Sequence, residues 1–225
     1  MPGEKRALAI EGPEEFAEAF KVPRETIHRL VRYADLLALW RKSTNLVAAS
    51  TLPALWSRHF ADSAQLSALA PEARLWLDLG SGAGFPGLVV AILHAERPDF
   101  RMHLVESNRK KCAFLAEVAR ATKAPVDIHA MRIEELAESA ETLKPDVVSA
   151  RALAPLPYLF ELAGPFFGPG TRGLFLKGRE AEAEIAEART RFDFGSRLHP
   201  SLTSRDSHIV EVTDLRPRIG GGSAP

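Results

Sequence analysis

The densest group of residues that could do chemistry is a glycine-rich loop at residues 77–87, Leu-Asp-Leu-Gly-Ser-Gly-Ala-Gly-Phe-Pro-Gly. A short apolar run leads into this glycine loop and a helical pattern follows it, with Pro86 suited to the first turn of that helix. Closely spaced glycines permit positive φ angles and let the main chain approach a ligand. Because ligands of open α/β sheets bind at the carboxyl ends of the strands, the loop predicts a ligand site.

Two kinds of ligand fit the glycine loop. Gly82, Gly84 and Gly87 have the spacing of a dinucleotide fingerprint, and Glu106 follows at nearly the interval of an acid that binds the ribose of NAD. Asp78, however, directly precedes the glycines, where a carboxylate would repel a pyrophosphate and attract a cation. S-adenosylmethionine carries a sulfonium and an ammonium group, so electrostatics favours this methyl donor. The residues expected to hold its methionine end are Asp78, Gly80, Gly82, Gly84 and Phe85.

Further candidate residues follow the later predicted strands. Glu106 closes the second strand, where a carboxylate can accept both hydroxyls of a ribose, in NAD or S-adenosylmethionine alike. Ile133 and Glu134 come after the third strand, at a position suited to contact an adenine ring. Arg151 ends the fourth strand and Lys177 the fifth. Both cations are expected at the reaction mouth as candidate catalytic residues. The alternatives for Arg151 are a structural ion pair with Asp78 or Glu106, or a solvated strand end.

Other reactive side chains favour structural roles. His59 and Asp62 lie three residues apart on one helical face, and no third ligand is close in sequence, so we expect a capping or interdomain hydrogen-bond cluster and no metal site. Cys112, the single cysteine, excludes a disulfide framework and is expected to be a structural thiol within a helix.

Two regions of different periodicity must position these residues. From Glu14 to Leu69 the pattern is helical, with one helix from Pro23 to Ser43–Asn45 and a second capped by Thr51, with Pro53 in its first turn. After Pro71, short β-rich runs alternate with helical stretches. The expected strands are Leu75–Leu79, Arg101–Val105, Val126–His129, Asp146–Ala150, Gly173–Lys177 and Ser207–Val212, and the expected helices include Asn108–Ala121 and Pro157–Phe167. Two late strands at Arg191–Leu198 and Ser207–Leu215 are also possible.

This alternation predicts an α/β fold with a doubly wound, mainly parallel, Rossmann-like sheet and an N-terminal helical extension. We expect residues 1–70 to form the extension, 71–218 the ligand-binding domain and 219–225 a flexible tail. The 225 residues are 46% hydrophobic and 26% charged, as in ordinary globular proteins. The longest apolar run, Leu88–Leu93, is too short to span a membrane, so we expect a soluble, cytoplasmic protein.

The charge distribution adds one candidate surface. Lys plus Arg number 29 and Asp plus Glu 29, so no net field attracts nucleic acid. The predicted helix over residues 21–42 nevertheless holds six basic and two acidic residues, a local charge of +4. This helix is therefore either a solvated face or a surface that follows phosphates.

Several segments, in this order, resemble the RsmG (GidB) family of bacterial methyltransferases, which modify guanine-N7 in small-subunit ribosomal RNA. They are Asn45-Leu46, the RHFADS segment at 58–63, the glycine loop, RIEE at 132–135, SRALA at 149–153 and LKG at 176–178. The resemblance implies a class I methyltransferase fold, with small-subunit ribosomal RNA, the 30S subunit or an assembly intermediate as partner. It also implies donor contacts at Gly80, Phe85, Ile133, Glu134 and Arg151. The family often has Asp where Glu106 stands, and both are carboxylates.

The absence of the catalytic residues that other methylation reactions need agrees with this chemistry. Guanine-N7 has an in-plane lone pair, so its methylation requires no deprotonation, whereas cytosine-C5 methylation needs an activated cysteine, and Cys112 is badly placed for that role. We therefore predict a monomeric enzyme without metal that transfers a methyl group from S-adenosyl-L-methionine to guanine-N7 of 16S ribosomal RNA. An NAD-dependent oxidoreductase and a non-catalytic RNA- or ribosome-binding protein on the same scaffold are the alternatives.

Overall fold

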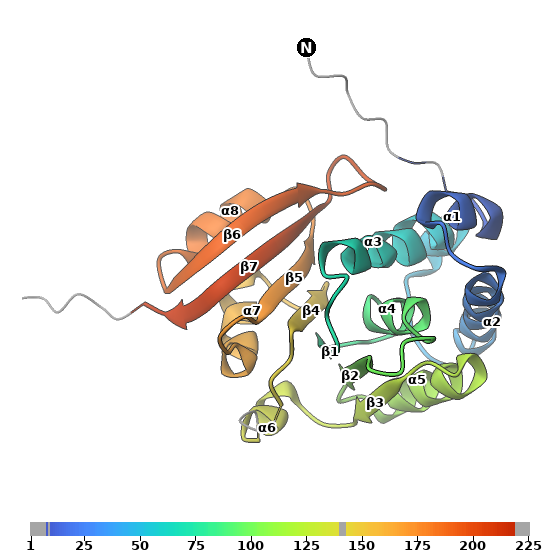
Figure 1. Ribbon diagram of the computed structural model, residues 1–225, viewed down its shortest axis with the longest axis horizontal. Coiled ribbons are helices and arrows are strands. Elements are labelled where there is room, and N and C mark those ends of the chain that lie inside the picture. The colour runs from blue at the N-terminus through green and yellow to red at the C-terminus, as the bar shows by residue number, and fades with distance from the viewer. Residues whose placement is uncertain (1–7, 9, 140–142, 219–225) are drawn as a thin grey trace, which may run out of the picture.

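A seven-stranded sheet forms the centre of the protein (Figure 1). The computed structural model describes residues 8, 10–139 and 143–218. The strand order is β3-β2-β1-β4-β5-β7-β6. The strands are β1 Leu75–Leu79, β2 Arg101–Val105, β3 Val126–His129, β4 Val147–Arg151, β5 Arg172–Lys177, β6 Phe192–Pro200 and β7 His208–Pro217. Strands β1 to β5 are parallel, whereas β7 runs antiparallel to β5 and β6 antiparallel to β7. The predicted doubly wound α/β fold is confirmed.

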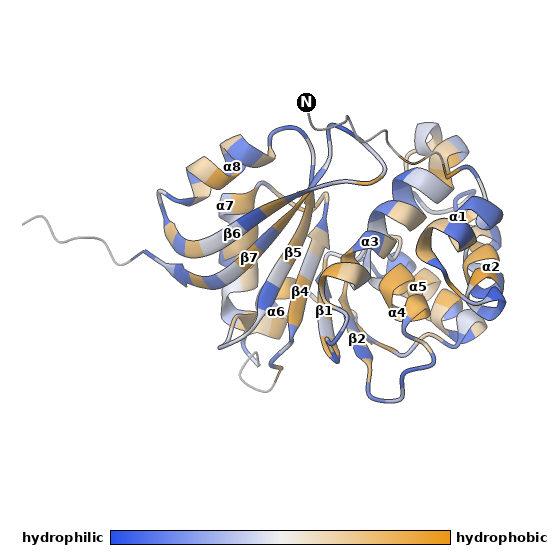
Figure 2. Cartoon of the chain, turned by 45° about the horizontal axis from the view of Figure 1, so that its top comes forward, coloured by the Kyte–Doolittle hydropathy of each residue, from blue (hydrophilic) through white to orange (hydrophobic). Residues whose placement is uncertain are grey.

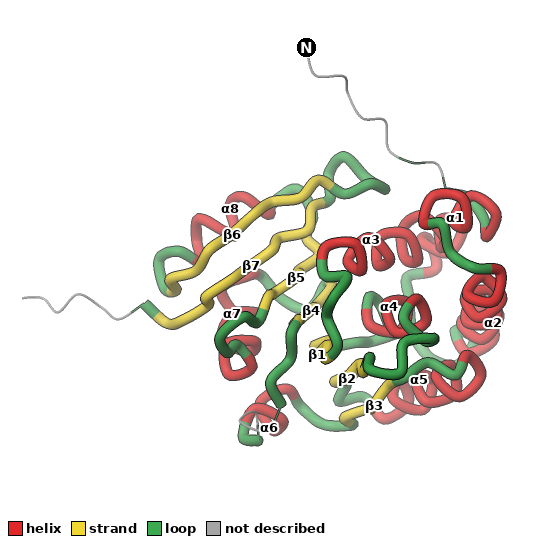
Figure 3. The backbone as a smooth tube through the Cα atoms, in the orientation of Figure 1, coloured by secondary structure: helices red, strands yellow, loops and turns green. Residues whose placement is uncertain are grey.

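Helices cover both faces of this sheet and bury two apolar clusters against it (Figures 1 and 3). The N-terminal helical segments are α1 Pro13–Phe20, α2 Arg24–Trp40, η1 Ala49–Ala54, η2 Trp56–Ala61 and α3 Asp62–Leu69. The remaining ones are α4 Gly87–Leu93, α5 Arg109–Thr122, α6 Ile133–Ala137, α7 Leu156–Ala163, η4 Gly164–Phe166 and α8 Ala181–Ala188. Figure 2 shows apolar residues gathered on α4, where six of seven residues are buried. One cluster joins α4 and α5 to the N-terminal helices, and the other joins the sheet to α6, α7 and α8.

The N-terminal helices share their core with the sheet. Leu30, Tyr33 and Leu37 of α2 are fully buried in the same cluster as Trp76 of β1. Trp40 at the end of α2 packs against Phe114 of α5, with ring centroids 5.7 Å apart. The predicted N-terminal extension is thus part of a continuous core with the sheet, and the expected flexible tail at 219–225 lies outside the described residues.

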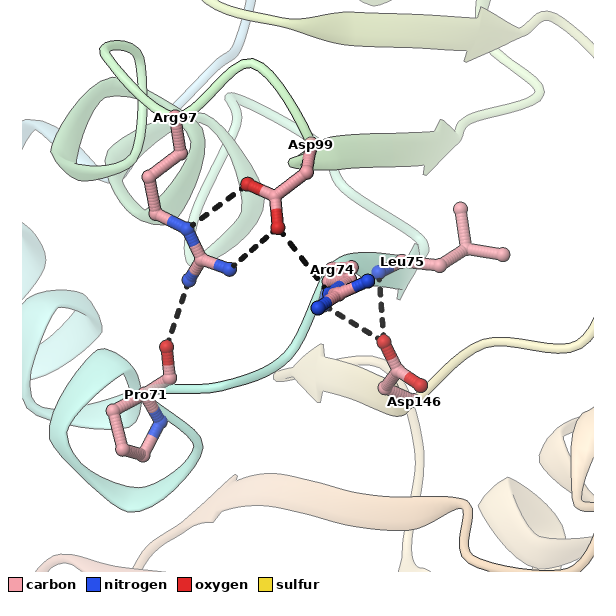
Figure 4. Close-up of polar contacts among 6 residues, drawn as sticks. All are labelled: Pro71, Arg74, Leu75, Arg97, Asp99 and Asp146. Carbon is pink, nitrogen blue, oxygen red and sulfur yellow. Dashed lines mark hydrogen bonds and ion pairs between the residues drawn. The ribbon is translucent and has the colours of Figure 1, made fainter.

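A polar network fixes the amino ends of the central strands (Figure 4). The Asp146 carboxylate, just before β4, accepts hydrogen bonds from the backbone amides of Arg74 and Leu75 at 2.7 and 2.9 Å. Asp99, before β2, contacts the Arg74 guanidinium at 3.2 Å. These bonds hold the starts of β1, β2 and β4 in register, so the opposite ends of these strands also meet at one edge.

The prediction of a helix that starts at Thr51 is wrong. Residues 49–54 instead form the 3-10 turn η1, with Pro53 inside it, and η2 is a π-helical turn that leads into α3. The Thr51 hydroxyl donates to the Ala48 carbonyl at 2.7 Å and caps no helix. Pro86 likewise lies just before α4 and not in its first turn, and α2 ends at Trp40, before the predicted Ser43.

Candidate active site

The glycine loop joins β1 to α4 at the carboxyl edge of the parallel strands. Gly80, Gly82 and Gly84 have φ angles of +64°, +59° and +96°. A Cβ atom on Gly84 would lie 2.6 Å from the Tyr33 hydroxyl and 2.5 Å from the Leu88 side chain, so only glycine fits there. A Cβ atom on Gly82 would meet only the Gly80 carbonyl oxygen, at 3.7 Å. The main chain at Gly82 therefore borders space that a ligand can enter.

Tyr33 of α2 fixes the loop from the N-terminal side. Its buried hydroxyl donates to the Ala83 carbonyl, and its ring stacks on Phe85 with centroids 5.3 Å apart and planes 19° apart. Burial raises the pKa of Tyr33 well above its usual value, so the hydroxyl stays a neutral donor. Tyr33 was not among the residues predicted for the site. Its signal in the sequence is that it is the one hydroxyl-bearing aromatic residue in the apolar stripe of α2.

Glu106 lies beside the glycine loop, as its predicted role requires. Its buried carboxylate accepts hydrogen bonds from the Gly82 amide at 3.0 Å and the Asn108 amide at 2.7 Å. A carboxylate offers about four lone-pair positions, so capacity remains for two hydroxyls of a ribose. The contact between Glu106 and a ribose remains a prediction, and the position of the carboxylate beside the glycine loop fits it.

Asp78 faces the interior of the protein. Its side chain is 0% exposed and accepts hydrogen bonds from the Ser149 hydroxyl at 2.7 Å and the Gly87 amide at 3.3 Å. The indole of Trp76 donates to Ser149 in turn, at 2.9 Å. Burial raises the pKa of Asp78 to about 6, against the lowering effect of these hydrogen bonds and of Arg151. Asp78 has no exposed oxygen that could touch a bound donor. It can therefore affect donor binding only through the shape of the glycine loop and through its charge.

Ile133 and Glu134 open α6 directly after the β3 edge of the sheet. The Ile133 side chain is buried in the cluster that contains Leu79 and Val105, whereas Glu134 is exposed. One apolar and one polar residue thus follow β3, at the edge where β1 ends in the glycine loop. Their predicted contact with an adenine ring is compatible with this position.

Arg151 is held by the N-terminal helical segment. One terminal nitrogen donates to the Arg58 carbonyl at 3.0 Å, and the other lies 2.6 Å from His59 Nδ1. The guanidinium also covers the Phe85 ring, 4.9 Å from its centroid. The acids proposed for its structural ion pair, Asp78 and Glu106, are not among its hydrogen-bond partners in the described structure.

These contacts define the protonation of His59. A guanidinium can only donate, so Nδ1 of His59 accepts and the proton resides on Nε2, which donates to the Thr51 hydroxyl at 2.9 Å. Burial, together with the charges of Arg151 and Arg58, lowers the pKa of His59 to about 3. A neutral imidazole therefore links Arg151 to η1.

Asp62 joins the same segment to the turn between β6 and β7. Its Oδ1 accepts hydrogen bonds from Gln65 at 2.9 Å, Ser201 at 3.1 Å and Thr203 at 3.0 Å. Burial raises the pKa of Asp62. Together with the bond between His59 and Arg151, these contacts confirm a hydrogen-bond cluster, which links residues 58–65 to β4 and to the turn between β6 and β7.

The ammonium of Lys177 is already paired within the protein. It donates to the Ala154 carbonyl at 2.5 Å and forms an ion pair with Glu184 of α8 at 2.7 Å. The side chain is only 10% exposed. Lys177 thus holds the segment after Arg151 against α8, a positioning role that its place at a strand end does not reveal.

The structural reading of Cys112 is confirmed. Its buried thiol donates to the Glu106 carbonyl at 3.0 Å, and burial raises its pKa. Within the described residues, no group of three or more His, Cys, Asp or Glu side chains could hold a metal ion. In the same part of the chain, no helix is long and apolar enough to cross a membrane.

Two surface hollows of the described residues lie away from the strand ends that carry these residues. One, of about 540 Å³, is lined by Arg189, Phe192 and other residues of β6 and β7, and the other, of about 400 Å³, adjoins η4. Neither is lined by a residue of the glycine loop. We assign the candidate site from the glycine loop, Glu106 and Arg151, because hydrogen-bonding groups converge there.

Solved structures show the class of fold. The fold is similar to that of an O-methyltransferase from Bacillus cereus in complex with SAH, with a TM-score of 0.60 and 15% identity over 90% of this chain and 96% of that chain. It is also similar to MtNAS in complex with S-adenosylmethionine, with a TM-score of 0.53 and 16% identity over 89% and 82% of the two chains. The protein has the fold of class I S-adenosylmethionine-dependent methyltransferases.

Sequence comparisons identify the family. Residues 26–210 match the model of the GidB family, rRNA small subunit methyltransferase G. A protein named Ribosomal RNA small subunit methyltransferase G from Parvibaculum lavamentivorans is 53% identical over 90% of this chain and 89% of its own length. Proteins of the same name from Methylorubrum populi and Nitrobacter winogradskyi are 50% and 47% identical over 86% and 90% of this chain, and over 91% and 73% of their own lengths. The chain belongs to the GidB family.

Proposed function

We propose that this protein transfers a methyl group from S-adenosyl-L-methionine to guanine-N7 of 16S, small-subunit ribosomal RNA. The observation that carries the proposal is the convergence of an open glycine loop, the Glu106 carboxylate and the Arg151 guanidinium at one edge of the sheet, in a chain of the GidB family. The relatives' shared name, Ribosomal RNA small subunit methyltransferase G, supports the substrate class.

The residues present fit the donor. Gly82 offers main chain without a side chain, and Glu106 beside it offers acceptors for the ribose hydroxyls. Ile133 and Glu134 would lie against the adenine, and Gly80 to Phe85 would surround the methionine end. When bound, S-adenosylmethionine supplies a methyl group activated by its sulfonium.

The NAD alternative is disfavoured by the start of α4. A dinucleotide site of this kind places the pyrophosphate against free amides at the start of the helix that follows the loop. Here the Gly87 amide donates to the buried Asp78 carboxylate, and a Cβ atom on Gly87 would lie 2.4 Å from Leu104. A buried carboxylate at this place opposes a second anion.

The proposed reaction needs alignment more than acid–base catalysis. The N7 lone pair lies in the plane of guanine and attacks without loss of a proton, so orientation can supply much of the acceleration, roughly 7–11 kcal/mol where alignment is complete. His59 accepts from Arg151 and has a pKa of about 3, so it is no base for this step. Arg151 uses two of its five N–H groups on Arg58 and His59, which leaves others for a ligand. Methylation at N7 gives the guanine a positive charge, which would repel the Arg151 guanidinium. The favourable partner of Arg151 is therefore an anion, either the donor carboxylate or an RNA phosphate.

The finer assignments follow from this function. We infer a cytoplasmic monomer whose substrate is ribosomal RNA within the small subunit or an assembly intermediate. In support of the monomer, the large hydrophobic side chains exposed within the described residues are few: Leu8 and Leu202, in segments joined by a backbone hydrogen bond, and Leu39 and Tyr158, on α2 and α7. Light scattering of the purified protein measures this directly, and a dimer would contradict it.

Methyl transfer from labelled S-adenosylmethionine to unmodified small-subunit ribosomal RNA, with identification of the product nucleoside, tests the function. N7-methylguanosine is the expected product, and another methylated nucleoside would contradict the assignment. A parallel titration with both cofactors should raise the melting temperature with S-adenosylmethionine and not with NAD. RNA binding without donor binding would instead favour the non-catalytic alternative.

A further inference from the structure

Five cations lie at the end of α2 and the start of α5, two helices that pack side by side (Figure 1). This α2–α5 basic patch consists of Arg41, Lys42, Arg109, Lys110 and Lys111. The contact between Trp40 and Phe114, at 5.7 Å, joins its two segments. The α5 segment follows Asn108, whose amide donates to Glu106, so the patch borders the proposed ribose site.

The cations of α5 occupy an unfavourable position for the helix itself. Arg109, Lys110 and Lys111 fill the first turn of this 14-residue helix, and the first turn holds no acid. Positive side chains at a helix amino terminus oppose its dipole, which favours Asp and Glu there. The Asn108 side chain caps the helix by accepting from the Lys110 and Lys111 amides, so the cations contribute nothing to capping. A sequence that departs from a local rule in this way indicates a functional demand.

The patch is also not neutralised by the protein. Among the described residues, none of its five side chains has an ion-pair partner, and four of the five are exposed. Some basic residues elsewhere are paired with acids. Arg29, within the predicted basic helix, contacts Glu25 at 3.7 Å and Glu96 at 2.5 Å, and Arg120, at the other end of α5, contacts Glu117 at 2.8 Å.

We propose that the α2–α5 basic patch binds the phosphate backbone of the RNA substrate, next to the nucleotide that enters the active site. The proposal rests on the proposed function for the identity of the RNA. Several unpaired cations on one surface are the footprint of a polyanion, which they bind without reading its sequence. The proposal places the phosphate surface at the carboxyl end of the helix over residues 21–42 and at the start of α5, because these two segments adjoin each other and α5 begins beside Glu106, whereas Arg29 is already paired.

The double variant Arg109→Gln and Lys110→Gln tests this surface. Affinity for unmodified small-subunit ribosomal RNA should fall at least tenfold, and the slope of log affinity against log salt should flatten by roughly one unit for each lost contact. The affinity for S-adenosylmethionine should not change. The melting temperature should rise, because two charges that oppose the helix dipole are removed.

The matched control is Lys21→Gln with Arg24→Gln. It removes the same charge at Lys21, which directly follows α1, and at Arg24, which opens α2 at the opposite end of that helix from Arg41 and Lys42. Its melting temperature should change little, because Lys21 favours the dipole at the end of α1 whereas Arg24 opposes that of α2, and its RNA affinity should not change.

Two results would overturn the proposal: a stabilised double variant with unchanged RNA affinity and salt slope, or an equal loss of affinity in both variants. RNA affinity is measured without methyl transfer, so its outcome is independent of the reaction. A wild-type protein that binds RNA through the patch but makes no N7-methylguanosine would contradict the proposed function and leave the patch in place.

Discussion

The guanidinium of Arg151 obtains its orientation from residues more than 90 positions earlier in the chain. Its partners, the Arg58 carbonyl and His59 Nδ1, both belong to η2, a π-helical turn. Turns of this kind are uncommon and often lie at functional sites. The planar fork of arginine satisfies both acceptors and still covers Phe85, an arrangement that an ammonium cannot reproduce.

Variants of His59 test whether it positions Arg151. His59→Asn keeps an acceptor near the place of Nδ1 and should retain methyl transfer within a few-fold. His59→Leu removes the acceptor and should reduce transfer at least tenfold, about 1.4 kcal/mol in the barrier, as should Arg151→Lys. Because His59 has a pKa of about 3, the wild-type rate should show no titration of this residue between pH 5 and 8. Equal activity of the Asn and Leu variants, at equal thermal stability, would exclude the positioning role.

The buried carboxylate of Asp78 makes a separate prediction about pH. Its pKa of about 6 in the folded protein exceeds the ordinary 3.8, so the folded state binds this proton more tightly than the unfolded state. The contribution of Asp78 to the free energy of unfolding therefore falls as pH rises from about 4 to 6, by about 3 kcal/mol. Asp78→Asn should remove this fall, so that the variant melts higher than wild type at pH 7 and near it at pH 4.

The same variant should lose affinity for S-adenosylmethionine. It should lose less affinity for the demethylated product, because only the donor carries a sulfonium charge. Melting curves at pH 4, 5 and 7 and calorimetric titrations with both ligands measure these effects. A variant that is less stable than wild type at pH 7, or that binds both ligands unchanged, would contradict the electrostatic role of Asp78.

Among the elements, α2 controls the shape of the glycine loop. The Tyr33 hydroxyl bonds to Ala83 and leaves no room for a side chain on Gly84. Removing it in Tyr33→Phe should cost about 1 kcal/mol of stability and leave the Ala83 carbonyl without this donor. The looser loop should weaken donor binding, which calorimetry measures. Tyr158→Phe, at a tyrosine that is 49% exposed, is the control and should change neither quantity.

Elements with a clear periodic pattern could be predicted from the sequence, and β1, β2 and β3 begin and end where expected. The glycine loop and Glu106 were also predictable, because short-range spacing specifies both. The π-helical turn could not be predicted, since its conformation depends on packing of Phe60 and His59 against Phe85. The same holds for Lys177, whose partner Glu184 belongs to a helix that the sequence pattern does not place in space.

On the scale of the whole molecule, the shared apolar core predicts one folding unit. Leu37 of α2 is fully buried in that core, so Leu37→Ala should cost about 2–5 kcal/mol. Calorimetry should show one unfolding transition, which moves to lower temperature as a whole. S-adenosylmethionine should still raise the temperature of this transition. Leu39→Ala, two residues away at a side chain that is 60% exposed, should leave the transition near its wild-type position. Two separate transitions would show that the N-terminal helices fold independently.

The position of β7 has a consequence for biosynthesis. This strand, the last of the sheet along the chain, does not lie at the edge but between β5 and β6. Until it leaves the ribosome, β5 presents an unpaired edge, and the turn that carries Ser201 and Thr203, the partners of Asp62, lacks the strand that follows it. A nascent chain released before β7 would expose that edge to other chains. Stop codons ahead of residue 208 should therefore yield aggregated polypeptide in the cell and not a shortened, folded enzyme.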